Sequence, residues 1–175
     1  MSSVRKNMFP KVAVAIGLVA VLGSSAAAAA GVHLLAPPST AHGGGFQLEA
    51  QKDTTFCVDV DPGGIPGSAL SLSVCSAAAS QRWTFTSNTD GSNLLVDWSG
   101  FCVDAAGHTA GDGVALQAVN CNFAKSQRLR FTSAGSIQIG GTKNCLSFVR
   151  VASGAAITLE SCSNPLGVQR FKLAQ

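Results

Sequence analysis

The sequence predicts an all-β domain built from three homologous repeats of about 43 residues. The first observation is one pattern that occurs three times: a cysteine followed by a short apolar run, a second cysteine, and Gln-Arg followed by a large apolar residue. The copies run over 56–83, 101–129 and 144–171, and their first cysteines lie 45 and 43 positions apart. The second observation is that the chain alternates apolar and polar residues over short runs and shows no sustained helical stripe.

Six of these runs have the length and alternation of β-strands: 69–74, 82–85, 114–119, 129–131, 136–139 and 156–159. Turn-forming clusters at 61–64, 89–92, 111–113 and 163–165 separate the strands. One unit of this size cannot bury its own apolar face, so the three units are expected to share a single core. A propeller has a similar period but needs at least about four blades, which argues against it here.

The N-terminal segment has the layout of a secretory signal peptide. Three basic residues precede an uncharged apolar run over 12–22, which leads into small residues. We therefore expect residues 1–30 to be removed by cleavage near Ala28–Ala30 and the protein to be secreted. An uncleaved membrane anchor is the alternative, because the uncharged stretch approaches the length of a spanning helix. Residues 31–45 are expected to form a flexible leader, and residues 46–175 a single domain.

The charge balance gives no support to a nucleic-acid or anionic-membrane partner. Three of the 12 basic residues and none of the nine acidic ones lie in the expected signal peptide, which leaves nine of each. The basic character of the whole chain therefore belongs to the export signal. We expect no nucleic-acid ligand, and no membrane partner after cleavage.

The six cysteines are expected to form three local disulfides, because the chain is exported and each repeat holds two cysteines. The two cysteines of a repeat lie 18, 19 and 17 positions apart, and equivalent units should pair equivalently: Cys57 with Cys75, Cys102 with Cys121, and Cys145 with Cys162. A zinc site is disfavoured, because the sequence has no Cys-x-x-Cys pair and no nearby histidine ligand. No metal or other cofactor is expected.

The Cys-x-Asp openings and the repeated Gln-x-aromatic endings resemble the ricin B-chain type lectin family, whose fold is a β-trefoil. The resemblance covers essentially all of 46–175. Gln81-Arg82-Trp83 matches the family motif fully, Gln169-Arg170-Phe171 keeps an aromatic residue, and Gln127-Arg128-Leu129 keeps only an apolar one. The simplest interpretation of this motif is structural, with a buried amide that satisfies backbone groups and a large side chain in the common core.

Sugar binding in the similar lectins rests on the Asp of the opening, a Gln four positions before the second cysteine, an aromatic residue two before it, and an Asn-Gln pair. Such a set offers polar partners to vicinal hydroxyls and an apolar face to the ring. The second repeat keeps Asp104, Gln117 and Gln127, with Val119 and Ser126 at the other two positions. The resemblance therefore implies that the second repeat is the best candidate site.

The other two repeats keep less of the set. The first retains Asp59 and Gln81, so Asp59 marks a residual second site. Its Gln, aromatic and Asn positions are Ser71, Ser73 and Ser80. The third repeat is expected not to bind sugar, because its Asp, Gln, aromatic and Asn positions are Ser147, Thr158, Glu160 and Val168. His108 or Phe123 is a candidate to replace the missing aromatic platform, although a solvated loop histidine and a packing phenylalanine are the plainer interpretations. Asp59 and Asp104 are also suited to capping turns through neighbouring backbone groups.

No catalytic set is apparent. Two of the three histidines fall in the leader, and no histidine, carboxylate and nucleophile combine into a triad. We expect a monomeric, non-enzymatic protein that binds polysaccharide or glycoconjugate glycans weakly, with polymeric ligands raising the avidity. The alternative is a trefoil that has lost sugar binding and recognises an extracellular protein, which the missing aromatic residues favour.

Overall fold

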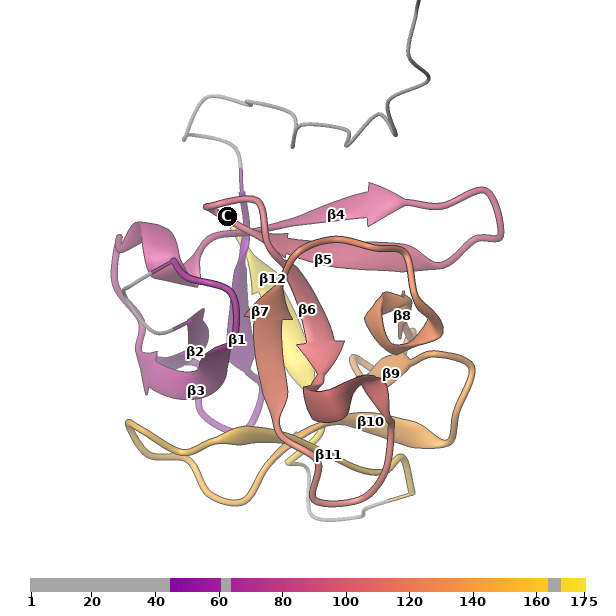
Figure 1. The fold of residues 1–175 in the computed structure, drawn as a ribbon. Coiled ribbons are helices and arrows are strands. Elements are labelled where there is room, and N and C mark those ends of the chain that lie inside the picture. The colour runs from indigo at the N-terminus through magenta and orange to yellow at the C-terminus, as the bar shows by residue number, and fades with distance from the viewer. Residues whose placement is uncertain (1–44, 61–63, 164–167) are drawn as a thin grey trace, which may run out of the picture. The chain divides into compact units, whose positions relative to one another are not determined.

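The computed structural model describes residues 45–60, 64–163 and 168–175. The predicted signal peptide, nearly all of the predicted leader, and parts of the turn clusters at 61–64 and 163–165 lie outside the described residues. The structure is all-β, and twelve strands lie within its described part (Figure 1). The strands are β1 (Gln47–Ala50), β2 (Phe56–Val60), β3 (Ser68–Val74), β4 (Trp83–Ser87), β5 (Asn93–Asp97), β6 (Cys102–Ala105), β7 (Leu116–Val119), β8 (Leu129–Phe131), β9 (Ile137–Ile139), β10 (Asn144–Phe148), β11 (Ile157–Ser161) and β12 (Phe171–Ala174).

The fold is a β-trefoil, and each sequence repeat supplies four consecutive strands to it. The first and fourth strands of the repeats pair around a ring: β12 with β1, β4 with β5, β5 with β8, and β8 with β9. The ring closes through a bridge between Phe46 and Trp83 and through the bond from the Phe171 N–H to the Gly135 carbonyl (2.8 Å). All of these pairs are antiparallel, as expected for strands that return through short turns.

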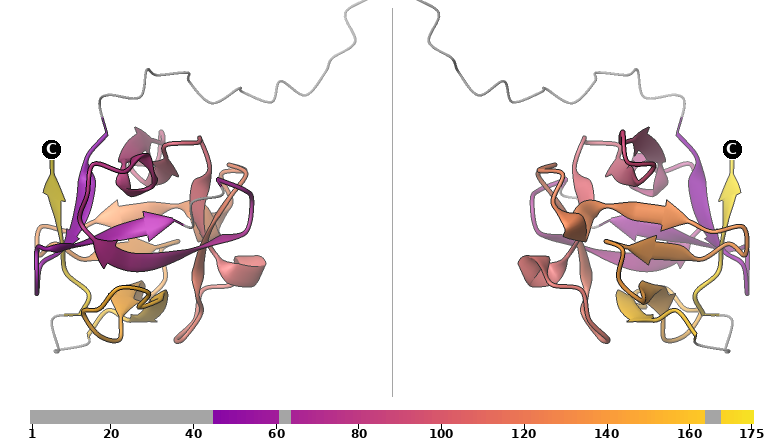
Figure 2. Two further views of the ribbon diagram at one scale, coloured as in Figure 1. Left: turned by 90° about the vertical axis from the view of Figure 1, so that its left-hand side faces the viewer. Right: turned by 90° about the vertical axis from the view of Figure 1, so that its right-hand side faces the viewer.

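The second and third strands of each repeat form a hairpin, and the three hairpins contact one another (Figure 2). Strand β3 pairs with β7, and single bridges join Ser71 to Ala156 and Ala115 to Thr158. Each hairpin therefore packs against the other two, which explains why a single repeat does not complete the fold.

The core consists of the inward-facing apolar residues of all three repeats. Strand β3 shows the alternation clearly, since Leu70 and Leu72 are buried while Ala69 is exposed and Ser71 is only partly buried. Trp83 is fully buried, and its indole N–H donates to the Val58 carbonyl (3.1 Å). Leu129 and Phe171, at the equivalent positions of the other repeats, are buried too. These three side chains fill the shared core, in agreement with the structural interpretation of the motif.

The three disulfides join Cys57 to Cys75, Cys102 to Cys121, and Cys145 to Cys162, which are the pairs expected from the repeats. Each disulfide links the second strand of a repeat to a cysteine one or two residues after the end of its third strand. Among the described residues, no helix is long and apolar enough to span a membrane. The helical elements described are three short 3-10 turns: η1 (Ala79–Gln81), η2 (Ala106–His108) and η3 (Lys125–Gln127).

The predicted strand runs agree with β3, β4, β7, β8, β9 and β11 to within two residues at each end. Arg82 and Val114 were expected in strands but lie outside them. Arg82 follows η1 directly, and the N–H of Val114 closes a turn onto the Gly111 carbonyl (3.3 Å). Turn hydrogen bonds at these two residues replace the strand pairing that alternation alone suggested.

Candidate functional site

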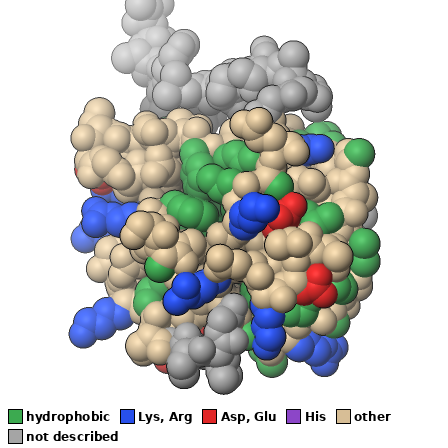
Figure 3. Space-filling model, turned by 180° about the vertical axis from the view of Figure 1, so that it is seen from behind, with side chains coloured by type: hydrophobic (Ala, Val, Ile, Leu, Met, Phe, Trp, Pro, Cys, Tyr) green, Lys and Arg blue, Asp and Glu red, His purple; other side chains and the backbone are tan. Residues whose placement is uncertain are grey.

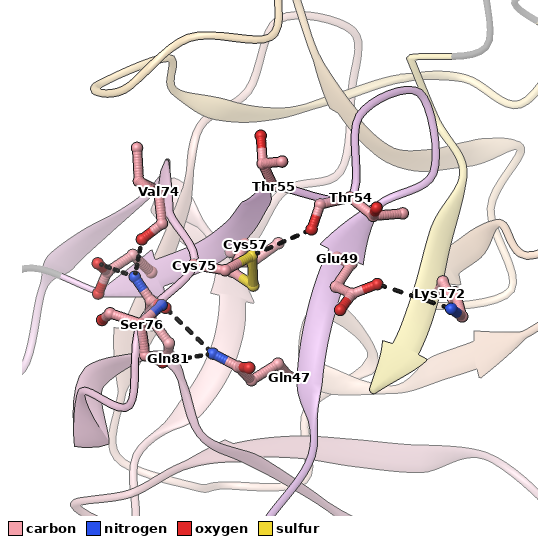
Figure 4. Close-up of a disulfide and its surroundings, with 12 residues drawn as sticks. Gln47, Glu49, Thr54, Thr55, Cys57, Val74, Cys75, Ser76, Gln81 and Lys172 are labelled. Atoms are coloured by element: carbon pink, nitrogen blue, oxygen red, sulfur yellow. Dashed lines mark hydrogen bonds and ion pairs between the residues drawn. A yellow bond between two sulfur atoms is a disulfide. The ribbon is translucent and has the colours of Figure 1, made fainter. Parts of the chain in front are cut away.

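The glutamine that ends each repeat anchors the backbone around the second cysteine. In the first repeat the Gln81 Nε2 donates to the Val74 carbonyl (3.0 Å), and the Gln81 Oε1 accepts from the Ser76 N–H (2.7 Å). Figure 4 shows this amide between those residues, with Gln47 donating to the same oxygen (3.1 Å). The side chain is buried, so its polar atoms are satisfied by protein groups.

Gln127 does the same in the second repeat. Its Nε2 donates to the Asn120 carbonyl (2.9 Å), and its Oε1 accepts from the N–H groups of Asn122 (2.8 Å) and Phe123 (3.2 Å). In the third repeat, the Gln169 Nε2 donates to the Ser161 carbonyl (2.8 Å). Because the third repeat keeps this bond without an acidic partner, the glutamine has a structural role that does not depend on a ligand site.

In the first two repeats the same amide also holds the aspartate of the opening. The Gln127 Nε2 donates to the Asp104 Oδ2 (3.1 Å), and the Gln81 Nε2 donates to the Asp59 Oδ2 (3.0 Å). Both carboxylates leave Oδ1 buried, with no hydrogen-bond partner in the described part of the chain. Neither carboxylate bonds to a backbone group of the described residues, so for Asp104 the contacts differ from the turn-capping role considered above. The turn after Asp59, at 61–63, lies outside the described residues.

Gln117 faces Asp104 across the β6–β7 hairpin, because the two residues are directly paired in its register. Paired residues of antiparallel strands project from the same face of the sheet, so both side chains belong to one site. Gln117 is half-buried, while Asp104 is fully buried with 0% of its surface exposed. The three residues that the second repeat retains are thus brought together, with Gln127 as the support of the carboxylate.

The equivalent positions of the other repeats are paired in the same way. Asp59 faces Ser71 across β2–β3, and Asp59 is only partly buried. Ser147 faces Thr158 across β10–β11, so two short hydroxyl side chains stand where the second repeat has a carboxylate and an amide. The third repeat therefore presents neither a carboxylate nor an amide at these two positions.

His108 contacts Asp104 directly. Its Nδ1 lies 2.7 Å from the Asp104 Oδ2, the oxygen that also accepts from Gln127. An ionised carboxylate only accepts, so the tautomer that forms a hydrogen bond to it here is the one with its proton on Nδ1. His108 ends η2, with a positive φ of 58°, and 58% of its side chain is exposed. It is therefore more than the solvated loop residue of the plainer interpretation.

Phe123 differs from its plainer interpretation too. It also has a positive φ (60°) and is 43% exposed, so it is not a packing residue of the core. Its N–H bonds to the Gln127 amide oxygen, which places its backbone beside the group that supports Asp104. The second repeat therefore has an exposed aromatic side chain on a residue whose backbone bonds to Gln127, while Val119 occupies the family's usual aromatic position.

Sequence reasoning missed two features of this site. The first is the complete burial of Asp104. The second is the contact of its carboxylate with a histidine ring nitrogen, which occurs where Gly107 (φ 71°) and His108 both have left-handed backbone. The four-residue spacing of Asp104 and His108 is a weak signal, because no regular helix joins them. A hollow of about 360 Å³ beside the third disulfide is lined by Gln138, Lys143, Ser161, Cys162 and Ser163, and includes none of the residues predicted to bind sugar.

Two family models match the chain. The ricin-type beta-trefoil lectin domain matches residues 91–175, and the ricin-type beta-trefoil lectin domain-like model matches residues 33–118. Together they extend over residues 33–175. No curated protein matches the sequence significantly.

Solved structures resemble the fold at low sequence identity. A designed three-fold symmetric protein, ThreeFoil, is 19% identical over 74% of this chain and 97% of its own, with a TM-score of 0.69. The earthworm R-type lectin C-half, solved in complex with GalNAc, is 15% identical over 74% of this chain and 96% of its own (TM-score 0.58). The exo-beta-1,3-galactanase 1,3Gal43A from Clostridium thermocellum is 19% identical over 74% of this chain (TM-score 0.67), but the match spans only 30% of that larger protein.

Proposed function

The chain belongs to the ricin-type β-trefoil lectin family, and we propose that it is a secreted carbohydrate-binding protein whose principal site lies in the second repeat. The observation that carries the proposal is the arrangement of Asp104 and Gln117 on one face of the β6–β7 hairpin, with the carboxylate fixed by Gln127. A carboxylate and an amide on one face offer acceptors and donors to neighbouring sugar hydroxyls.

The unpartnered Asp104 Oδ1 supports a polar ligand at this site. A buried carboxylate oxygen without a donor is costly, and a hydroxyl donor supplied by a ligand would satisfy it. Gln117 has no described side-chain bond to lose, so its amide is free to bond to a second hydroxyl. The exposed ring of Phe123 is the candidate for the apolar face of the sugar.

Gln127 takes no direct part in ligand binding in this proposal. Two hydrogen bonds from its Nε2 and two to its Oε1 use the capacity of the amide, so it positions Asp104. Asp59 in the first repeat is supported in the same manner by Gln81 and forms a second, weaker site. Two weak sites suit a polymeric ligand, because binding at one raises the effective concentration at the other.

Polysaccharide is favoured over nucleic acid by the spread of charge. On the face shown in Figure 3, the Lys and Arg side chains lie singly among other residues and form no continuous strip. A strip of clustered cations would be needed to follow a phosphate backbone. Export through the N-terminal signal is the accompanying proposal, and it would bring the protein to extracellular glycans.

The alternative function, recognition of an extracellular protein, is favoured by a separate observation. Asp104 is fully buried, and Val149, next to the end of β10, is 82% exposed. A single exposed valine is common on protein surfaces, so the alternative rests mainly on the burial of Asp104 and on Val119 at the family's usual aromatic position. A binding experiment with point variants distinguishes the two functions.

The test is a binding screen of the secreted protein against galactosides, arabinans, xylans and cell-wall glycans. Asp104→Asn keeps the size of the side chain but removes its charge, and it should abolish binding. Ser147→Ala changes the equivalent position of the third repeat and should leave binding unchanged. If no glycan binds to the wild-type protein, or if Val149→Ser abolishes capture of an extracellular protein, the alternative replaces this proposal.

A further inference from the structure

We infer that His108 is a lid on the second-repeat site, and that a sugar hydroxyl reaches Asp104 only when the imidazole leaves the carboxylate. The inference rests on the proposed function, and it concerns what controls entry to the site. Its starting point is a mismatch: the residue best suited to bind a hydroxyl has no exposed surface. A ligand can bond to Asp104 only after a neighbouring group has moved.

Of the two side chains bonded to Asp104, only His108 is free to move. Gln127 is fully buried and held by three further hydrogen bonds to backbone groups. The His108 ring has 58% of its surface exposed, and its bond to Asp104 is its one side-chain hydrogen bond in the described structure. Displacing His108 costs a single bond at the surface, whereas displacing Gln127 breaks the anchor of the second cysteine.

The turn that carries His108 is built for such movement. Its three residues are half-buried or exposed, and a Cβ placed on Gly107 would meet nothing within 4 Å. Ala106 is fixed to the hairpin by the bond from its N–H to the Ala115 carbonyl (2.9 Å), so the turn has an anchored base and an exposed tip. Only the tip needs to swing for the carboxylate to open.

The backbone of His108 stores strain that opening would release. A positive φ is uncommon for a residue with a side chain, although histidine tolerates it better than most. Such conformations persist where surrounding contacts hold them, and they cluster at ligand clamps and switch regions. The described contact that holds this one is the hydrogen bond to Asp104.

In the closed state, the His108 side chain competes with the ligand for Asp104. The His108 Nδ1 bonds to the Asp104 Oδ2, so a hydroxyl that reaches the unpartnered Oδ1 gains its bond only after the bond to His108 has been lost. The lid also selects among ligands, because only a sugar that satisfies both Asp104 and Gln117 compensates for its displacement. The weak site expected from the sequence has a physical cause in this contact.

The experiment compares His108→Gly and His108→Ala with the wild-type protein, using lactose, arabinan and xylan as probes in calorimetry. Glycine accepts a positive φ without strain, so it keeps the turn intact where alanine does not. Thr109→Ala is the matched control, since the bond described for its hydroxyl runs to the Gly107 carbonyl of the neighbouring turn (3.3 Å). All three variants leave Asp104, Gln117 and Gln127 in place.

The lid predicts that both His108 variants bind about two- to tenfold more tightly than the wild type, the range that one hydrogen bond accounts for. Thr109→Ala should bind like the wild type. Binding by the His108 variants alone, with a silent wild type, would also support the lid. Unchanged or weaker binding by both His108 variants would overturn the lid but leave the lectin function standing. If neither the wild type nor these variants bind any probe, the proposed function fails, and the lid fails with it.

Discussion

Replacing Gln127 tests whether the repeat-ending glutamine is mainly a structural anchor. Four hydrogen bonds involve its amide: two donated by Nε2 to Asp104 and Asn120, and two accepted by Oε1 from backbone N–H groups. A hydrogen bond contributes about 1 kcal/mol net to stability. Gln127→Ala should therefore lower the free energy of unfolding by about 4 kcal/mol, a large part of the 5–15 kcal/mol typical of a domain.

Gln117→Ala is the control, because Gln117 is half-buried and its side chain makes no described hydrogen bond. We expect it to change stability by less than about 0.5 kcal/mol, as surface substitutions usually do, while abolishing glycan binding. The two glutamines lie in the same repeat, so the pair separates the anchor from the ligand contact.

The assay is urea denaturation of the oxidised protein, followed by circular dichroism and by tryptophan fluorescence. Coincident transitions would justify a two-state free energy for each variant. A Gln127→Ala protein within 1 kcal/mol of the wild type would refute the reasoning, because it would mean that water satisfies the freed groups. A Gln117→Ala protein as unstable as Gln127→Ala would refute it in a different way.

Two further substitutions test local features of the fold. Gly140→Ala should destabilise the protein more than Gly141→Ala in thermal unfolding. Both glycines have positive φ, but only at Gly140 would a Cβ lie 2.6 Å from the Lys125 carbonyl oxygen. Equal melting temperatures of the two variants would argue against that close approach. Ser92→Ala should raise the pKa of Asp90 measured by NMR titration, because hydrogen bonds from the Ser92 hydroxyl and N–H hold that pKa below its ordinary value. A carboxylate with a lower pKa in the folded state stabilises the fold at pH values above its unfolded-state pKa, and this stabilisation is lost as the pH falls through the folded-state pKa. The variant should therefore lose less stability on acidification than the wild type. An unchanged Asp90 pKa would contradict this.

The fold was predictable because several levels of the sequence agree. The spacing of the cysteines, the short alternating runs and the repeated Gln-Arg endings all indicate one repeating all-β unit, and the resemblance to the lectin family completes the β-trefoil. Trp83, Leu129 and Phe171 are recognisable as core residues because each ends a repeat next to a buried glutamine. Strand β5 was harder to predict, since its Leu-Leu-Val run does not alternate.

The candidate site was only partly predictable. Strand register follows from the repeat, so the pairing of Asp104 with Gln117 could be expected from their equivalent places in the family pattern. The position of His108 could not, because it depends on two consecutive left-handed residues in a short turn. The exposure of Phe123 has the same cause, since its positive φ turns the chain at a residue for which packing was the plainer interpretation.

The most direct test of the central claim is NMR chemical-shift mapping of the isotope-labelled protein with the glycan that binds best in the screen. A second-repeat lectin site predicts that the largest shift changes occur at Asp104, His108 and Gln117, with smaller changes around Asp59 and none around Ser147. Changes centred on the third repeat, or no changes with any glycan, would contradict the account.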